Sequence, residues 1–386
     1  MGRLSVEPSK AIAQLLRDQR QQRGWTLRDV ENRSRSLGRP IPFTTLAKVE
    51  QGKVDPGLRR LNVLLKLYDL SPRLALDVVD LEEFSGEVPA DTPLATLHEN
   101  ALRAWRSGDL RTGFTLLAAL RSRTSEGATD PVVRQKAVLS VAVIIGSLGR
   151  YRLSRHILEE LLVEPPAPEV LVPILVQSAV CWHWLGSGET ALGFLARADE
   201  NANPDDHRQL AWIAHELAST LVSMGRLDDA DKALERAIGE YSTAGDRYGE
   251  CQAMGVRVRL RCERGDLLGA LSAAREARRQ AEQSGFGRLA LLRLLDEGRI
   301  VGNLGDREQG FVLLHEGLAQ AIATQDRVAQ FHAHRNLWKA FELARDAERA
   351  GVELSAARYF SQFIDSATPE AKEVRALADT RHAARS

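Results

Sequence analysis

Gly225-Arg-Leu-Asp-Asp-Ala230 has two counterparts further along the chain, Gly265-Asp-Leu-Leu-Gly-Ala270 and Gly305-Asp-Arg-Glu-Gln-Gly310. The three glycines are 40 residues apart, and each is followed after five residues by alanine or glycine. Apolar residues at helical spacing precede and follow each glycine. A small residue is needed where two antiparallel helices cross closely, so the stretch predicts a helical hairpin that is repeated along the chain.

The same turn signal occurs earlier in the chain at a less regular interval, as Gly108-Asp109, Gly149-Arg150 and the pair Gly186 and Gly188. Together these signals give six clear repeats and a degenerate seventh from Gln330 to Phe360. Seven positions before the glycine a second small residue stands in three of the repeats, namely Ala142, Ala218 and Gly298, whereas Val258 departs from this pattern. We therefore expect an all-α fold in which residues 94–386 form an α-solenoid, with Pro369–Ser386 as a capping helix and frayed tail.

These helix pairs resemble tetratricopeptide (TPR) repeats, although the interval is longer than the usual ~34 residues. The resemblance spans most of residues 94–360 and implies a concave face that is lined by the first helix of each pair. If the glycine sets the frame, the position six residues before it points into this face. That position holds Ser219, Arg259, Arg299 and Lys339, and neighbouring inward positions hold His215, Asn303, His332 and Arg335.

Cations that are aligned in a groove favour a ligand that carries a carboxylate, because charge-assisted hydrogen bonds hold it there. We therefore predict that a peptide or another small anionic ligand binds to the concave face. Its predicted contacts are His215, Arg259, Arg299, Asn303, His332, Arg335 and Lys339. The alternative is a solvated arginine face without a ligand, which is common in arginine-rich sequences.

Charge is unevenly distributed along the chain, although the formal net charge is zero. Residues 1–75 contain 15 Lys and Arg against 7 Asp and Glu, a net charge of +8, so the rest of the chain is acidic. A basic module on an acidic body indicates a polyanionic partner for the first module only. Residues 76–93 mix glycine, proline and acidic residues, and we expect them to be an acidic hinge between two domains.

Four short helices are expected within residues 1–75. Thr26 and Asp29 have the spacing of a capping box at the start of the second helix, and Gly24 ends the first. The third helix is Pro42-Phe-Thr-Thr-Leu-Ala-Lys-Val-Glu-Gln-Gly-Lys53, which a glycine closes. Leu46 and Val49 lie on one of its faces, and small polar and cationic residues lie on the other.

The pattern Leu16-Arg17, Arg20, Gly24-x-Thr26 and Leu46-Ala-Lys-Val-Glu-Gln-Gly-Lys53 resembles the helix-turn-helix domain of phage-repressor-like (XRE-type) transcription regulators. The resemblance covers about residues 9–72 and implies that the third helix lies in the major groove of double-stranded DNA. It implies that Phe43, Thr44, Thr45 and Lys48 face the bases, while Gln51 and Lys53 meet the phosphate backbone.

One position departs from this family. Leu27 stands where the family often has a glutamine that binds phosphate. The connector between the second and third helices is also longer than usual, and it contains Arg35 and Arg39. These arginines either replace the missing phosphate contact or are merely solvated.

Other classes of protein have little support in the sequence. No apolar run approaches the ~20 residues that span a bilayer, and the first residues have no apolar segment of a secretory signal. The scattered cysteines, Cys181, Cys251 and Cys262, fit a reducing cytosol. The nine histidines form no metal-ligand pattern, and no catalytic or phosphate-binding motif is present, so we expect neither an enzyme nor a cofactor.

An XRE-like domain joined to a TPR array resembles the peptide-responsive bacterial regulators of the RRNPP group. The resemblance implies a cytoplasmic homodimer that binds a palindromic operator and takes part in quorum sensing through a signalling peptide in its groove. Two alternatives remain open. The repeats could dock another protein rather than a small ligand, or the chain could be a TPR scaffold that does not bind DNA.

Overall fold

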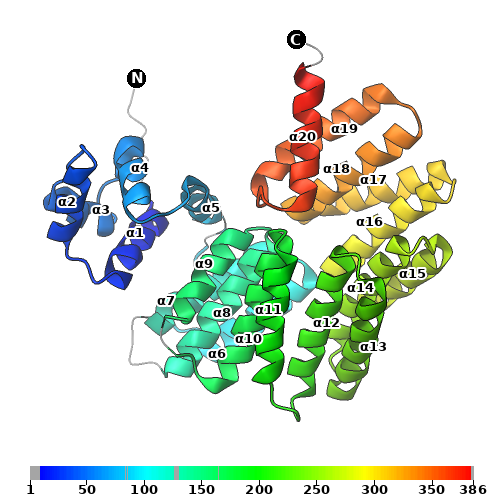
Figure 1. Cartoon of the computed structure of the whole chain (residues 1–386), viewed down its shortest axis with the longest axis horizontal. Helices are drawn as coiled ribbons and strands as arrows, with labels where there is room; N and C mark the ends of the chain where they lie inside the picture. Colours follow the sequence, from blue (N-terminus) through cyan, green and yellow to red (C-terminus); the bar gives the residue numbers. More distant parts are fainter. Residues whose placement is uncertain (1–8, 83, 85, 126–129, 164, 384–386) are drawn as a thin grey trace. The chain divides into compact units, whose positions relative to one another are not determined.

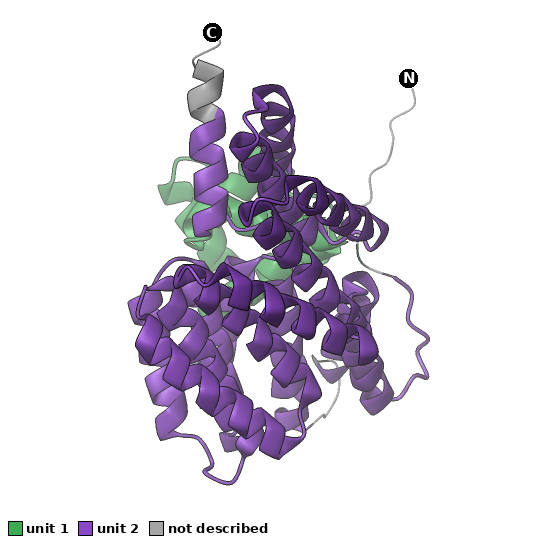
Figure 2. Cartoon of the chain, turned by 90° about the vertical axis from the view of Figure 1, so that its right-hand side faces the viewer, with its two compact units in different colours: residues 1–85 green, residues 86–386 purple. Residues whose placement is uncertain are grey.

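The computed structural model is all-helical in the residues that it describes, which are 9–82, 84, 86–125, 130–163 and 165–383. These residues form twenty α-helices and one 3-10 helix (Figure 1). The chain divides into two compact units, residues 1–85 and residues 86–386 (Figure 2). The predicted fold class is confirmed. Within the described ranges, no helix combines the length and the apolarity needed to cross a membrane.

The first unit contains α1 (Lys10–Gln22), α2 (Leu27–Ser36), α3 (Phe43–Glu50), α4 (Gly57–Leu67) and α5 (Pro72–Glu82). The capping box at the start of α2 is present, since the Thr26 hydroxyl accepts from the Asp29 amide at 3.2 Å and the Asp29 carboxylate accepts from the Thr26 amide at 2.7 Å. Side chains from α1 to α5 meet in one core that includes Leu16, Val30, Leu46, Val49, Leu64 and Tyr68.

The hinge predicted for residues 76–93 begins later than expected. Helix α5 continues to Glu82, and the Glu82 carboxylate accepts a hydrogen bond from the amide of Ala11 in α1 at 2.8 Å. Leu74 and Leu81 are buried, and Asp77 is buried beside Arg73 at 2.9 Å. Asp77, Asp80 and Glu82 of the predicted hinge therefore belong to a helix that packs on the first unit, whereas Glu87 and Asp91 follow it and Glu83 lies outside the described residues.

The rest of the predicted hinge is attached to the second unit. Residues 86–93 contain no helix. The guanidinium of Arg123 in α7 donates hydrogen bonds to the carbonyl oxygens of Pro89 at 2.6 Å, Thr92 at 2.8 Å and Val88 at 3.2 Å. Because these three carbonyl groups lie outside any helix or sheet, they lack backbone partners, and one arginine satisfies all three.

Seven helix pairs follow one another in the described part of the second unit. They are α6 (Leu94–Ser107) with α7 (Leu110–Ser125), α8 (Pro131–Ser147) with α9 (Tyr151–Leu161), α10 (Pro168–Trp184) with α11 (Gly188–Glu200), α12 (His207–Ser223) with α13 (Leu227–Ala244), α14 (Arg247–Glu263) with α15 (Leu267–Gln283), α16 (Gly287–Asn303) with α17 (Arg307–Ala323), and α18 (Arg327–Leu343) with α19 (Ala347–Phe360). The 3-10 helix η1 (Ser361–Phe363) and α20 (Pro369–Ala383) complete the unit. The degenerate seventh repeat is therefore a true helix pair.

Small residues lie at the close crossings within the pairs, as the sequence predicts. Ala230 and Ala270 are fully buried. A methyl group on Gly310 of α17 would come within 2.9 Å of the Cα of Gly302 in α16. The tight turn before the second helix has a positive φ at Gly305, 112°, and the seventh pair places Arg345 there with a φ of 59°. Because this turn holds an arginine and not a glycine, the spacing of the glycines does not reveal it.

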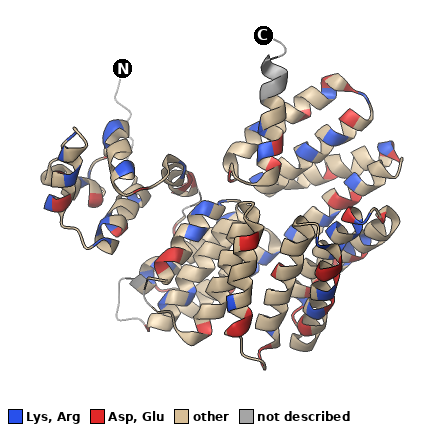
Figure 3. Cartoon of the chain, in the orientation of Figure 1, with Lys and Arg blue, Asp and Glu red and all other residues tan. Residues whose placement is uncertain are grey.

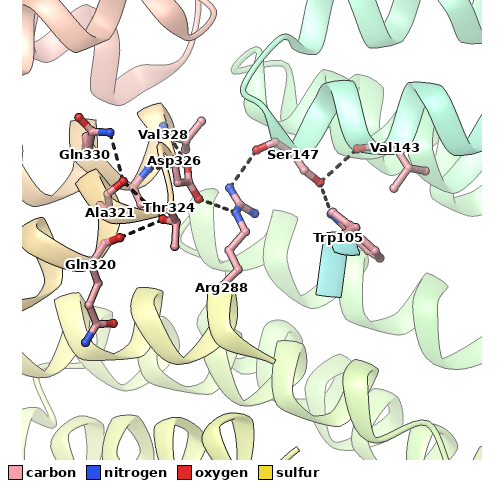
Figure 4. A network of polar contacts seen from close by, with 11 residues as sticks. Trp105, Val143, Ser147, Arg288, Gln320, Ala321, Thr324, Asp326, Val328 and Gln330 are labelled. Carbon is pink, nitrogen blue, oxygen red and sulfur yellow. Dashed lines mark hydrogen bonds and ion pairs between the residues drawn. The ribbon is translucent and has the colours of Figure 1, made fainter. Parts of the chain in front are cut away.

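Contacts between distant repeats fold the second unit back on itself. Arg288 of α16 donates to the backbone carbonyl of Ser147 in α8 at 2.9 Å and to the carboxylate of Asp326, the N-cap of α18, at 2.8 Å (Figure 4). Trp105 of α6 donates to the Ser147 hydroxyl at 3.0 Å. After η1, the Asp365 amide donates to the carbonyl of Gly149 at 2.8 Å. The second, sixth and seventh pairs are thus joined directly.

We predict that Gly310→Ala lowers the free energy of unfolding by about 1–3 kcal/mol, because the added methyl group overpacks the crossing of α16 and α17. Gly302→Ala is the matched control, since a methyl group there meets no atom within 4 Å. That variant should gain about 0.4–1 kcal/mol, because alanine restricts the unfolded chain. Thermal unfolding followed by circular dichroism measures both. Equal effects of the two substitutions would refute the close crossing.

Candidate functional site

The exposed face of α3 carries most of the residues that we predicted to read DNA. Phe43 is 40% exposed, and Thr44 and Lys48 are exposed, whereas Thr45 is half-buried. Leu46 and Val49 on the opposite face are each 2% exposed and pack in the core. The helix is therefore amphipathic in the predicted sense.

Polar contacts fix α3 against its neighbours from both ends. The Phe43 amide donates to the carboxylate of Glu31 in α2 at 3.2 Å, so Glu31 supplies the cap that Pro42 lacks. At the other end, two nitrogens of Arg20 in α1 donate to the two carboxylate oxygens of Glu50, each at 2.8 Å. Glu50 is buried and therefore structural, while Phe43, Thr44 and Lys48 remain exposed on the helix that these contacts hold.

The predicted phosphate contacts border this face. Gln51 and Lys53, which follow α3, are exposed, as are Arg35 and Arg39. Arg35 lies 3.6 Å from Glu31, but its side chain is 65% exposed, so this pair holds it weakly. The contacts of these residues with DNA remain predictions.

Arg28 is a further cation on this face that the sequence did not single out. Leu27 packs against the core of the first unit, so its side chain does not replace the glutamine of the related family. Arg28, the next residue, is exposed, and its guanidinium lies 5.6 Å from the centre of the Phe43 ring. Its place beside the capping box was a usable signal, but only the packing of α2 on α3 brings it to Phe43.

The seven predicted ligand contacts lie on first helices of the repeats, and one bond confirms their register. Arg259 in α14 donates to the hydroxyl of Ser219 in α12 at 2.6 Å, across one 40-residue interval. Arg299 in α16 reaches back to the Cys262 sulfur at 3.6 Å. Corresponding positions of successive repeats are therefore neighbours on this face.

Three of the predicted contacts line one pocket between α16 and α18. These are Arg299, Asn303 and Lys339, and Asn336 joins them. His215 and Arg259, which belong to earlier repeats, are outside this pocket, and so are His332 and Arg335. The predicted contacts therefore do not share one pocket, and residues of α17 also line the pocket that three of them enter.

Helix α20 neutralises the cations of α18. The Glu373 carboxylate lies 2.8 Å from the Lys339 ammonium and 2.5 Å from the Arg335 guanidinium. Burial opposes the charge of Glu373, but the hydrogen bonds from Lys339 and Arg335 outweigh it and lower the pKa of this carboxyl. Residue spacing does not connect α20 with these two residues, and we expected only a capping helix there.

Buried titratable groups surround Arg259. His215 and His183 in α10 are each 7% exposed, and burial, followed by the charge of Arg259, lowers the pKa of both imidazoles to about 3. Burial also raises the pKa of Glu216 to about 7. Both histidines are therefore neutral at physiological pH, and Glu216 is only partly ionised.

Among solved structures, this chain is similar to a Rap protein complexed with competence and sporulation factor, with a TM-score of 0.53 and 12% sequence identity over 75% of this chain and 87% of that chain. It is also similar to PlcR of Bacillus thuringiensis in complex with the peptide PapR7 and DNA, with a TM-score of 0.46 and 11% identity over 74% of this chain and 99% of that chain. Neither a protein-family model nor a curated protein matches the sequence. At 12% identity, the likeness to the Rap protein shows a shared helical-repeat fold and no more.

The buried histidines predict a dependence of stability on pH. A histidine whose pKa is depressed on folding is neutral in both the folded and the unfolded state at pH 7, and it destabilises the folded state as the pH falls below 6.5, because only the unfolded chain then takes up the proton. The raised pKa of Glu216 acts in the opposite direction between pH 7 and 4.5 and cancels about one histidine. We therefore expect a net loss of about 1.4 kcal/mol per pH unit between pH 6.5 and 5 from these three groups.

Denaturant unfolding at pH 7, 6 and 5 tests this expectation. The quantity compared between variants is the slope of the free energy of unfolding against pH. His215→Gln should remove about 1.4 kcal/mol per pH unit of acid sensitivity, and Glu216→Gln should add about as much. Slopes that stay the same in both variants would contradict the assigned protonation states.

Proposed function

We propose that this chain is a DNA-binding transcription regulator whose first unit reads DNA through α3 and whose repeat unit senses a signalling peptide or another small anionic ligand. The observation that carries the proposal is the exposed face of α3. Phe43, Thr44 and Lys48 face solvent together, on a helix that Glu31 and Glu50 fix at its two ends. The chain acts in this proposal as a regulator and not as an enzyme.

The side chains on this face suit the edges of bases in the major groove. Lys48 can donate to guanine O6 and N7, and the Thr44 hydroxyl can pair with several bases. Phe43 offers an apolar contact for a thymine methyl group. Exposed cations at Arg28, Arg35, Arg39 and Lys53 surround this face and would supply contacts to phosphates.

The sensing role rests on the concave face of the repeats. Its helices present Arg259 and Arg299 with solvent access, in a fold that resembles the Rap protein complexed with competence and sporulation factor. That protein holds its factor on a fold of the same kind, which supports a ligand-sensing role for these repeats.

Footprinting on DNA upstream of the chain's own gene, followed by gel shifts, tests the DNA-binding role. Lys48→Ala should weaken binding by about 1–3 kcal/mol and relax specificity at one base pair. Lys232→Ala removes an exposed cation of α13 as a control and should leave DNA affinity unchanged. Equal weakening on all sequences would reassign Lys48 to phosphate. A wild-type chain that protects no DNA would favour the repeat scaffold without DNA binding.

A homodimer on a palindromic site is part of this proposal. One short helical module covers little DNA surface, so a single copy would bind a specific site weakly. Sedimentation velocity should show two chains per duplex on a palindromic site, and one chain per duplex on the isolated half-site at low protein concentration. A single chain on the full palindrome would contradict the dimer.

Docking of a partner protein on the repeats is the second candidate. Its support is a set of exposed apolar side chains on second helices, where Leu268 is 72%, Val312 55% and Val352 63% exposed. Replacing all three with serine should abolish regulation in the cell if a protein docks there. The same change should leave the response of the purified chain to a small ligand intact.

A further inference from the structure

Two of three neighbouring arginines on the concave face share one carboxylate, and the third has none within ion-pair distance among the described residues. Arg293 of α16 lies 3.2 Å from Asp296, and Arg299 lies 3.6 Å from the same side chain. Arg259 has no carboxylate at this distance among the described residues, and its hydrogen bond goes to the neutral hydroxyl of Ser219. Burial and the like charge of Arg293 lower the pKa of the Arg259 guanidinium. Asp296, Glu216 and Glu370 act on Arg259 through their charges but none forms a direct ion pair with it, so its guanidinium is only partly compensated.

Arginines outside this cluster are paired differently. Arg264, which directly follows α14, donates to Asp231 at 2.8 Å and to Asp228 at 2.9 Å, both in α13, and charges of both signs lie on α13 and α15 (Figure 3). Such pairs satisfy a guanidinium without any ligand. The contrast with Arg264 indicates that Arg259 lacks an ion-pair partner for a reason other than a shortage of acidic residues in these repeats.

Unused hydrogen-bond donors adjoin these guanidinium groups. The Nε of Arg293 and the Nδ1 of His215 are buried and have no hydrogen-bond partner in the part of the chain that the structure describes. His215 is only 7% exposed, and its neutral ring can donate one N–H. The Ser219 hydroxyl accepts from Arg259 and can donate its own proton. Buried polar groups of this kind are normally satisfied, so a missing acceptor is indicated.

Gly255 makes room for the Arg293 guanidinium. A methyl group on this glycine of α14 would lie 1.8 Å from Arg293 Nη1, and the three atoms nearest to that methyl group all belong to Arg293. Glycine in the middle of a helix costs about 0.5–1 kcal/mol relative to alanine. Glycine at this position therefore lowers the stability of α14 but leaves room for the Arg293 guanidinium to lie across it.

The other end of the predicted ligand contacts is already occupied from within the chain. Arg335 and Lys339 both bind the Glu373 carboxylate of α20. A ligand carboxylate there would have to displace Glu373, whereas no carboxylate of the described residues lies within ion-pair distance of Arg259.

We propose that the repeat unit binds the carboxylate of its ligand at Arg259 and Arg293, with Ser219 and His215 as further donors, and that Arg335 and Lys339 are not part of this site. The ligand class is a small molecule or peptide with a free carboxylate. This inference rests on the ligand-sensing role proposed above, and of the seven predicted contacts it keeps His215 and Arg259.

Succinate is a suitable probe, with succinamide as its uncharged analogue and sodium chloride at matched ionic strength as the reference. In the full chain without DNA, succinate should raise Tm in a dose-dependent way beyond both controls, because a ligand that binds only the folded state stabilises it. Calorimetric titration gives the affinity. Inorganic phosphate is tested in parallel, and a chain that binds phosphate but not succinate would overturn the carboxylate class.

Two variants locate the site. Arg259→Met should weaken succinate binding at least about tenfold, which is a difference that titration resolves readily. Gly255→Ala removes no charge and favours the helix, but its methyl group displaces the Arg293 guanidinium, so it should also weaken binding while the chain stays folded. Arg264→Met is the matched control on α14 and should bind succinate as the wild type does.

Lys339→Met discriminates between the two ends of the groove. Succinate binding that survives Lys339→Met and fails in Arg259→Met and Gly255→Ala supports the proposal. Binding that is lost in Lys339→Met, kept in Gly255→Ala or absent from the wild type overturns it. The outcome does not depend on DNA binding. A chain that binds succinate at Arg259 without any change in DNA affinity would instead refute the sensing role and leave the site in place.

Discussion

The close crossing of two helices at a small residue is the contact on which the repeat unit depends. At Ala230, Ala270 and Gly310 the backbones approach so closely that little or no side chain fits between them. This approach orients the first helix of each pair, and the 40-residue interval then places Ser219 beside Arg259. The concave face is thus a consequence of packing elsewhere. Small residues at the helix crossings determine where the charged residues of this face lie, and the charged residues supply its polar contacts.

Charge around Arg259 is arranged differently from charge elsewhere on the repeats. Arginines such as Arg264 are neutralised by nearby aspartates, so they add solubility and little else. Inside, Asp296 is shared by two arginines, Glu216 is only partly ionised, and Glu373 is used by the last repeat. Burying an uncompensated guanidinium is costly, and the cost is reduced when an anion arrives. A ligand that brings its own negative charge therefore completes an unfinished set of contacts.

The sequence was sufficient for the architecture and for much of the candidate sites. Periodic glycines and small residues revealed the helix pairs, because those positions have a steric requirement that few residues meet. Leu46 and Val49 were correctly placed in the core, which left Phe43, Thr44 and Lys48 exposed. Three features were not predicted from the sequence. Arg345 adopts the left-handed conformation that usually marks a glycine, and Glu373 reaches α18 only because α20 packs back on the repeats. The guanidinium of Arg293 has room only because residue 255, one repeat earlier, is glycine. Each depends on a contact between distant parts of the chain, which residue spacing alone does not encode.

The bonds from Arg288 to Ser147 and from Asp365 to Gly149 set this unit apart from an open array of repeats. An open array can gain or lose a repeat by insertion or deletion, since each unit contacts only its neighbours. Here an additional pair between α8 and α16 would carry Arg288 away from the Ser147 carbonyl, and the buried guanidinium would keep only the Asp326 carboxylate as an acceptor. The number of repeats between these contacts is therefore fixed by geometry. Such a chain cannot change its length there without rebuilding its closure.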